Sequence, residues 1–200
     1  MLIEHSGKRP VIDTIARIAP TAVICGDVTV GPGTSVGFGA VLTAESGPII
    51  VGRECVIMEN VVIRGTNRHP ATVGDHVLVG PGAYLSGCAI RDCAFLATGS
   101  RVFNGAIVGA RAEVRVNATV HLLTNLPEDS TVPIGWVAVG NPARILPPEA
   151  HDEIWAIQEP LNFPKEIFGV DRPKPGKTHM PEMMARYCRA LSRHRDDRVL

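Results

Sequence analysis

An aliphatic residue recurs at every sixth position along most of the chain, and this repeat limits the possible folds more than any other feature. Nineteen marker positions carry it, all of them Ile, Val or Leu: Ile18, Ile24, Val30, Val36, Leu42, Val51, Ile57, Ile63, Val73, Val79, Leu85, Ile90, Leu96, Val102, Val108, Val114, Val120, Leu126 and Val132. A period of six matches neither the alternation of a sandwich strand nor the spacing of an amphipathic helix. It indicates a repeat architecture.

A second column of mostly small or β-branched residues lies four positions after the markers. It comprises Ala22, Val28, Thr34, Ala40, Cys55, Val61, Val77, Ala83, Ala89, Ala94, Ser100, Ala106, Ala112, Ala118, Thr124 and Ser130, with Trp136 as the exception. One large and one small inward residue per repeat predict an all-β fold, a parallel β-helix shaped as a triangular prism, with a little over six turns. Each buried marker contributes about 1.5–3 kcal/mol, so the column can stabilise a chain with few aromatic residues.

Two interruptions of the repeat, Thr43–Ile50 and Arg64–Thr72, predict excursions from corners of the prism. Loops held on a rigid scaffold often carry function. The chain therefore directs attention to these two segments.

The repeat ends after Val139, and the sequence beyond it predicts helices. Pro147-Pro148 opens a helix over Glu149–Gln158, whose apolar face is Ile154, Trp155 and Ile157. The Pro-rich stretch Leu161–Gly176 is expected to lie extended along the prism. A last helix begins near Pro181, with an apolar stripe that we expect to dock on the prism or on a neighbouring subunit: Met180, Met184, Tyr187, Cys188 and Leu191. This divides the chain into an N-terminal segment (1–17), a β-helix (18–146) and a C-terminal helical extension (147–200).

Charge and composition argue against several classes of partner. The 20 basic and 20 acidic residues cancel, so no overall field favours nucleic acid or a membrane surface. No stretch of the sequence resembles a signal peptide, and no apolar run approaches about 20 residues, so we expect no membrane span. The five cysteines are odd in number and show no CxxC spacing, which favours reduced thiols and a cytoplasmic location.

Three stretches of the repeat region are distinctive: Leu85–Ile90 (LSGCAI), Asn104–Val108 (NGAIV) and Val137–Ala143 (VAVGNPA). Through them the segment from Ile18 to Arg144 resembles one family of hexapeptide-repeat proteins, the γ-class carbonic anhydrases and their relatives. The resemblance implies a left-handed β-helix with a helix packed alongside it. It also implies a homotrimer in which three histidines from neighbouring subunits hold zinc.

The zinc ligands do not carry over to this chain. Arg64, Pro81 and Ser86 stand where the family has its three histidines. Pro81 has no donor atom in its side chain, Ser86 is a weak neutral ligand, and Arg64 opposes a cation. The neighbouring motifs also differ, since Thr43-Ala44-Glu45 and Met58-Glu59 replace an Arg-Gly-Asp and a Gln-Asp. His69, His76 and His121 show no spacing typical of a metal site, so we expect neither a metal nor another cofactor.

The altered pocket still offers chemistry between subunits of the implied trimer. The residues expected there are Glu45, Met58, Glu59, Arg64, Tyr84, Ser86 and Asn104, with His69 nearby. For binding a small carboxylate or phosphate, Arg64 is the clamp, helped by Tyr84, Met58 and Asn104. Glu45, Glu59, His69 and Ser86 are the catalytic candidates. The alternative is that Glu45 or Glu59 only pairs with Arg64 and joins subunits.

Three functions remain open on these residues. The first is a metal-independent enzyme that acts on a small carboxylate- or acyl-containing molecule. The second is a CoA-dependent acyltransferase, for which His69 and His121 are the available catalytic histidines. The third is a non-catalytic ligand-binding or assembly protein, suggested by the length of the extension from Pro147 to Leu200.

Overall fold

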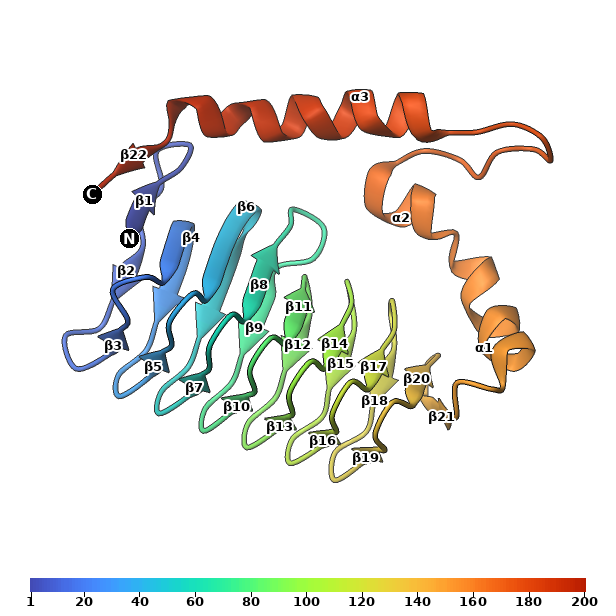
Figure 1. Ribbon diagram of the computed structural model, residues 1–200, viewed down its shortest axis with the longest axis horizontal. Coiled ribbons are helices and arrows are strands. Elements are labelled where there is room, and N and C mark those ends of the chain that lie inside the picture. Colours follow the sequence, from blue (N-terminus) through green and yellow to red (C-terminus); the bar gives the residue numbers. More distant parts are fainter.

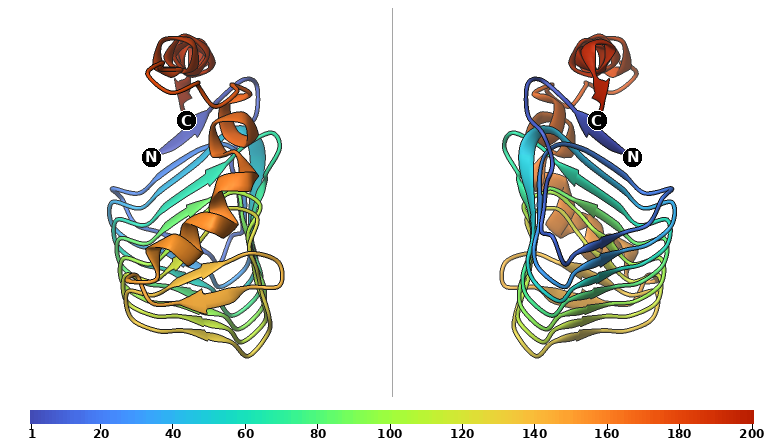
Figure 2. Two further views of the ribbon diagram at one scale, coloured as in Figure 1. Left: turned by 90° about the vertical axis from the view of Figure 1, so that its right-hand side faces the viewer. Right: turned by 90° about the vertical axis from the view of Figure 1, so that its left-hand side faces the viewer.

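The computed structural model describes residues 1–200 and is a left-handed parallel β-helix with α-helices alongside it. Seven strands stack in parallel on one face of the prism: β3 (Arg17–Ile18), β5 (Ser35–Val36), β7 (Val56–Ile57), β10 (Leu78–Val79), β13 (Phe95–Leu96), β16 (Glu113–Val114) and β19 (Thr131–Val132). Figure 1 shows the coils side by side, and Figure 2 looks along the stack.

The two remaining faces belong to one continuous sheet, because two long strands turn a corner and contribute to both. These strands are β4 (Val23–Val30) and β6 (Val41–Val51). One face continues through β8 (Val62–Gly65), β11 (Tyr84–Ser86), β14 (Arg101–Val102), β17 (Thr119–Val120) and β20 (Val137–Val139). The other holds β2 (Val11–Ile12), β9 (Ala71–Val73), β12 (Ala89–Ile90), β15 (Ile107–Val108) and β18 (Asn125–Leu126).

The marker column forms the core, as the repeat predicts. Every marker except Ile18 is buried, and most of the small residues of the second column are buried with them. One assignment in that column is wrong. Cys88 is buried, whereas Ala89 is only partly buried, because the short step before Ile90 moves the inward position back by one residue.

Both interruptions of the repeat leave the prism at the same corner of successive coils. In β6 the residues 45–48 stand opposite the single residue Asp27 of β4, so they bulge outward. In the next coil, residues 66–70 separate β8 from β9, and Thr66 and His69 close this excursion through reciprocal backbone hydrogen bonds. Pairing of Ala44 with Gly65 and of Ile49 with Ala71 stacks one excursion on the other.

The coil is longer than the repeat predicts. β1 (Leu2–Glu4) and β2 pair in parallel with β4, so ordered strands precede the first marker. These strands lie at one end of the prism in Figure 1. At the other end, β21 (Arg144–Leu146) folds back antiparallel to β20 and ends the stack.

The C-terminal extension differs from its prediction in one segment. α1 (His151–Gln158) and α3 (Met180–Leu191) confirm the two expected helices, and Ile154 is the buried residue of α1. The stretch expected to be extended instead contains a 3₁₀ turn, η1 (Glu159–Leu161), and a short helix, α2 (Phe163–Phe168). Pro164 in the first turn and Gly169 in the left-handed conformation after the last residue explain this helix.

The C-terminal residues return to the start of the chain. α3 runs along the prism (Figure 1), and it is followed by η2 (Ser192–Asp196) and β22 (Arg198–Val199). β22 pairs antiparallel with β1. The apolar stripe of α3 has no buried residue, and Met180, Met184 and Leu191 are exposed. None of the helices combines the length and hydropathy that crossing a membrane requires.

Replacing a marker residue tests the role of the column. Leu96 is fully buried in the middle of the stack, so Leu96→Ala should lower the free energy of unfolding by about 2–5 kcal/mol. Ile134→Ala is the control, because Ile134 is 69% exposed and its truncation should cost less than about 0.5 kcal/mol. Denaturant unfolding measures both, and equal losses would contradict the core assignment.

Candidate functional site

The corner that carries the two excursions also places Arg64 beside Ser86. Arg64 follows the buried marker Ile63 in β8, and because strand side chains alternate, it points out of the prism. Its neighbours in the sheet are Thr43 of β6 and Ser86 of β11. Arg64 and Ser86, two of the three residues that replace the family's zinc-binding histidines, thus stand next to each other in adjacent coils.

Three side chains hold the Arg64 guanidinium. It forms an ion pair with Glu45, which comes from the bulge of β6. It also donates to the hydroxyl of Tyr187 on α3 at 2.7 Å and to that of Tyr84 on β11 at 3.5 Å. Burial acts to lower the pKa of Arg64, but the bonds with Tyr84, Tyr187 and Glu45 outweigh it and raise the pKa above its ordinary value. Arg64 is therefore a fixed, permanently charged group.

A cavity of about 400 Å³ lies next to Arg64, between the prism and the C-terminal helices. The prism supplies its polar wall: Glu45, Ser46, Arg64, Thr66, Tyr84, Ser86 and Asn104. Phe103 of the prism, together with α2 and α3, supplies the apolar part, which includes Phe163, Ile167, Phe168 and Tyr187. The volume suits a small ligand, and the mixture of an apolar roof with a few polar groups is typical of a binding site.

α2 is fixed over this cavity through the second excursion. His69 Nε2 lies 3.0 Å from the Glu166 carboxylate on α2, and Arg68 donates to the Glu166 carbonyl oxygen at 3.1 Å. His69 does not line the Arg64 cavity but a smaller neighbouring one of about 140 Å³. Asn104 is buried and lines both cavities. In this structure His69 therefore holds α2 in place over the cavity.

The single chain does not bring all the predicted residues together. Met58 and Glu59 lie at the corner between β7 and β8, and Pro81 lies at the same corner of the next coil, after β10. Arg64 and Ser86 stand at the far ends of β8 and β11, at the next corner of the prism. Arg64, Pro81 and Ser86 offer no set of donors that suits zinc: one is a cation, one lacks a donor, and one is a neutral hydroxyl.

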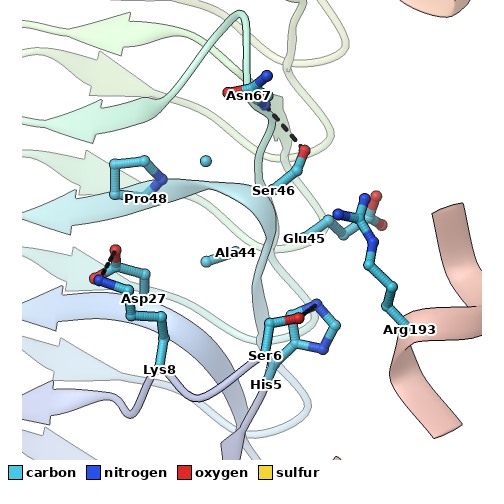
Figure 3. A pocket seen from close by; sticks show the side chains of 11 residues that line it. His5, Ser6, Lys8, Asp27, Ala44, Glu45, Ser46, Pro48, Asn67 and Arg193 are labelled. Carbon is cyan, nitrogen blue, oxygen red and sulfur yellow. Dashed lines mark hydrogen bonds and ion pairs between the residues drawn. The ribbon is translucent and has the colours of Figure 1, made fainter. Parts of the chain in front are cut away.

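Glu45 also borders a second, more polar cleft of about 510 Å³, drawn in Figure 3. Lys8, Asp27, Ser46 and Asn67 line it, together with Arg193 from the C-terminal segment. Figure 3 shows Arg193 reaching from the C-terminal ribbon toward Glu45. Glu45 therefore separates two clefts, and each of them includes a residue from α3 or η2.

His121 lines a third cavity of about 510 Å³, together with Phe103, Trp155, Phe163 and Arg172 among others. Its ring lies 5.6 Å from that of Phe103, and its buried Nδ1 atom has no hydrogen-bond partner. Burial lowers the pKa of His121 below its ordinary value, so the imidazole is neutral at pH 7. Nothing else in the structure uses this nitrogen.

Sequence reasoning missed the residues that close the site. Tyr187 was assigned to an apolar stripe, but its hydroxyl contacts Arg64. Phe163, Ile167 and Phe168 fall in the stretch expected to be extended. The pattern of Pro164 near the start and Gly169 after the end, around three apolar residues, was the available signal for α2.

Comparison with known proteins identifies relatives among the carbonic anhydrases. A protein of Methanocaldococcus jannaschii described as a probable carbonic anhydrase is 33% identical over 143 residues, which cover 72% of this chain and 86% of that protein. The mitochondrial gamma carbonic anhydrase 1 of Arabidopsis thaliana is 32% identical over 158 residues, or 76% of this chain and 55% of the plant protein. The chain thus spans about half the length of this relative. No family model matches the chain.

Among solved structures, the chain resembles two proteins whose descriptions name transferases. A putative acetyltransferase from Bacillus cereus has a TM-score of 0.54 and 26% identity, and the match covers 78% of this chain and 90% of that one. A hexapeptide transferase family protein from Anaplasma phagocytophilum has a TM-score of 0.52 and 27% identity, with 80% and 91% covered.

The contact between Tyr187 and Arg64 should fasten α3 over the cavity. Tyr187→Phe removes the hydroxyl that accepts from the charged guanidinium, a bond of a kind that contributes about 1.5–3 kcal/mol. Amide hydrogen exchange across Met180–Leu191 should therefore become faster. Tyr84→Phe is the matched control, because it removes a hydroxyl on the prism side of Arg64 and leaves α3 attached. Equal exchange rates in both variants would contradict this role.

Proposed function

Because the chain belongs to the γ-class carbonic anhydrase-like family of hexapeptide-repeat proteins, we propose that it is a homotrimeric enzyme that works without zinc in this cleft. Its substrate is a small carboxylate- or acyl-containing molecule that binds beneath α2 and α3. The observation that carries the proposal is the charged Arg64 beside Ser86 at the edge of a cavity of about 400 Å³.

The donor groups argue against zinc-dependent CO2 hydration. A catalytic zinc site needs three protein ligands and an open position for water. Here a permanent cation, a proline and a serine occupy the corresponding positions. The raised pKa of Arg64 keeps the guanidinium charged at neutral pH, and that charge repels a divalent cation.

The same charge favours a carboxylate. Arg64 is already paired with one, the side chain of Glu45, through one guanidinium nitrogen, and a substrate carboxylate can take the place of Glu45. Tyr84 and Asn104 would orient the bound molecule from the prism. Glu45, once displaced, becomes a free carboxylate that can act as a general base, with Ser86 as the neighbouring hydroxyl.

The trimer completes the site in this proposal. The corner with Met58 and Glu59 of one protomer would face the Arg64 corner of its neighbour, as the family resemblance implies. The exposed apolar stripe of α3, with Met180, Met184 and Leu191, supports an assembly that covers it. An assembly protein would need no cavity, whereas this cleft keeps room for a ligand above Arg64.

Arg64→Gln tests the proposed carboxylate site. Acetate, malonate and succinate serve as probes in titrations followed by NMR chemical shifts and thermal melting. Binding of the preferred probe should weaken about tenfold or more, because the variant loses a charge-assisted pair worth about 1.5–3 kcal/mol. Arg68→Gln is the control, since Arg68 is 65% exposed and contacts α2 outside the cavity.

Two results would contradict the proposal. One is unchanged binding in Arg64→Gln, provided that light scattering shows the same oligomer as the unmodified protein. The other is zinc-dependent CO2 hydration above the uncatalysed rate by the purified chain.

A second candidate function rests on His121. Its neutral imidazole lines a cavity of about 510 Å³ and suits a general base in acyl transfer from CoA. The imidazole would take the proton of an acceptor hydroxyl or amine as that group attacks the thioester carbonyl. The proton then passes to the leaving CoA thiolate. Likeness to hexapeptide transferase structures supports this reading.

Acetyl-CoA binding distinguishes the second candidate from the first. If His121 lies at an acyl-CoA site, acetyl-CoA should raise the melting temperature, and His121→Ala should abolish acetyl-CoA hydrolysis or transfer to hydroxylamine. His76→Ala is the control, because His76 is an exposed histidine paired with Glu54. Absence of any effect of acetyl-CoA on the melting temperature would remove this candidate.

A further inference from the structure

Four potential metal ligands meet where the two ends of the chain pair. β1 lies between β4, to which it is parallel, and β22, to which it is antiparallel. In the β1–β22 register Glu4 faces Arg198, so the next pair outward is His5 and Asp197. Ile3 faces Cys25 across the other side of β1. His194, in η2, completes the group.

The donor atoms of these four residues converge. All lie within 4.8 Å of one another. His5 Nδ1 is 2.6 Å from one Asp197 oxygen, and His194 Nδ1 is 2.8 Å from the other. Cys25 Sγ lies 3.7 Å from Asp197 Oδ2. No other group of three or more His, Cys, Asp or Glu side chains in the structure converges in this way.

The group is largely withdrawn from solvent. His5 and Cys25 are each 3% exposed, and the side chains of Asp197 and His194 are 19% and 29% exposed. No lysine or arginine pairs with Asp197, whose partners are the two imidazoles and the thiol. The Cys25 thiol and the Asp197 carboxylate are thus held in contact, with the two imidazoles beside them.

The two imidazole rings lie face to face beside the carboxylate. The His5 and His194 rings stack with centroids 4.2 Å apart and planes 26° apart, and both turn Nδ1 toward the carboxylate. Ser6 Oγ lies 3.3 Å from His5 Nε2, on the outer side of the ring. A hydrogen bond at the outer nitrogen is the usual way in which a neighbouring group fixes a histidine that binds metal.

We propose that His5, Cys25, His194 and Asp197 form a zinc site that fastens the C-terminal segment to the first coil. Two imidazole nitrogens, a thiolate and a carboxylate are a complete tetrahedral set for zinc. Ligand bonds of about 2.0–2.3 Å place ligand atoms about 3.4 Å apart in a tetrahedron. The spacings in the structure, from 2.6 Å to at most 4.8 Å, lie on either side of this value, and the stacked rings would rotate apart to bind one ion.

The site is separate from the Arg64 cleft, but it affects the same helix. His194 and Asp197 follow α3 directly, and Tyr187 of α3 contacts Arg64. Zinc would therefore hold the far end of the helix that roofs the cleft. With all four ligands supplied by the protein, no position remains for a catalytic water, so its role is structural.

Metal analysis of the purified full-length chain tests the proposal. After equilibration with zinc and desalting, the protein should retain one zinc per chain and melt at a higher temperature than after chelator treatment. Cobalt(II) in place of zinc should give the visible bands of a tetrahedral ion and a near-ultraviolet thiolate charge-transfer band. Hydrogen exchange across η2 and β22 should slow when zinc is bound.

Ligand variants complete the test. Cys25→Ser should lose the thiolate band, and Cys25→Ser and His194→Ala should each bind zinc at least about tenfold more weakly. Cys188→Ser and His151→Ala are the matched controls, because both residues are exposed and lie outside the group. Should a ligand variant fail to fold, the cobalt spectrum of the unmodified protein still decides the issue. The proposal would be overturned if the unmodified protein failed to retain zinc, or if both ligand variants bound zinc as tightly as the unmodified protein. The four side chains would then join the two ends of the chain through hydrogen bonds alone.

Discussion

Stacking of small coils with one shared core position per strand is the constraint from which the rest of this structure follows. A buried marker on each strand fixes the register of the next strand, so residues one turn apart in the sequence become neighbours in space. An insertion cannot enter the core without breaking the column, and it must leave at a corner. Both insertions do so at one corner in adjacent coils, which concentrates polar side chains around Arg64.

The prism could be predicted from the six-residue period, because the aliphatic residue at each marker position shows which residue of the repeat faces the core. The short step before Ile90 misled, since a five-residue spacing hides which of Cys88 and Ala89 turns inward. The grouping of Arg64, Ser86, Tyr84, Glu45 and Asn104 follows from the family resemblance, and all five line the cavity of about 400 Å³. Met58 and Glu59 belong to another corner, and the placement of a neighbouring subunit does not follow from one chain.

The C-terminal extension was harder to predict for a physical reason. α2 has six residues, too short for a period to emerge, and its contacts depend on an ion pair with His69 almost 100 residues away in the chain. The group around Asp197 is even harder to predict, because its four residues come from both ends of the sequence and show no regular spacing. Such sites depend on how the ends of a chain meet, and a local pattern carries no record of that.

Pairing of β22 with β1 also bears on the order in which the molecule is made. The coils and the excursions with Arg64 all precede α3, so they leave the ribosome first and can stack from the N-terminal end. β22, which anchors the segment after α3, leaves the ribosome later, so the edge of β1 that pairs with it stays unpaired until then. During synthesis the cleft is therefore open to solvent and to small molecules, and it closes only when the C-terminal segment reaches the first coil.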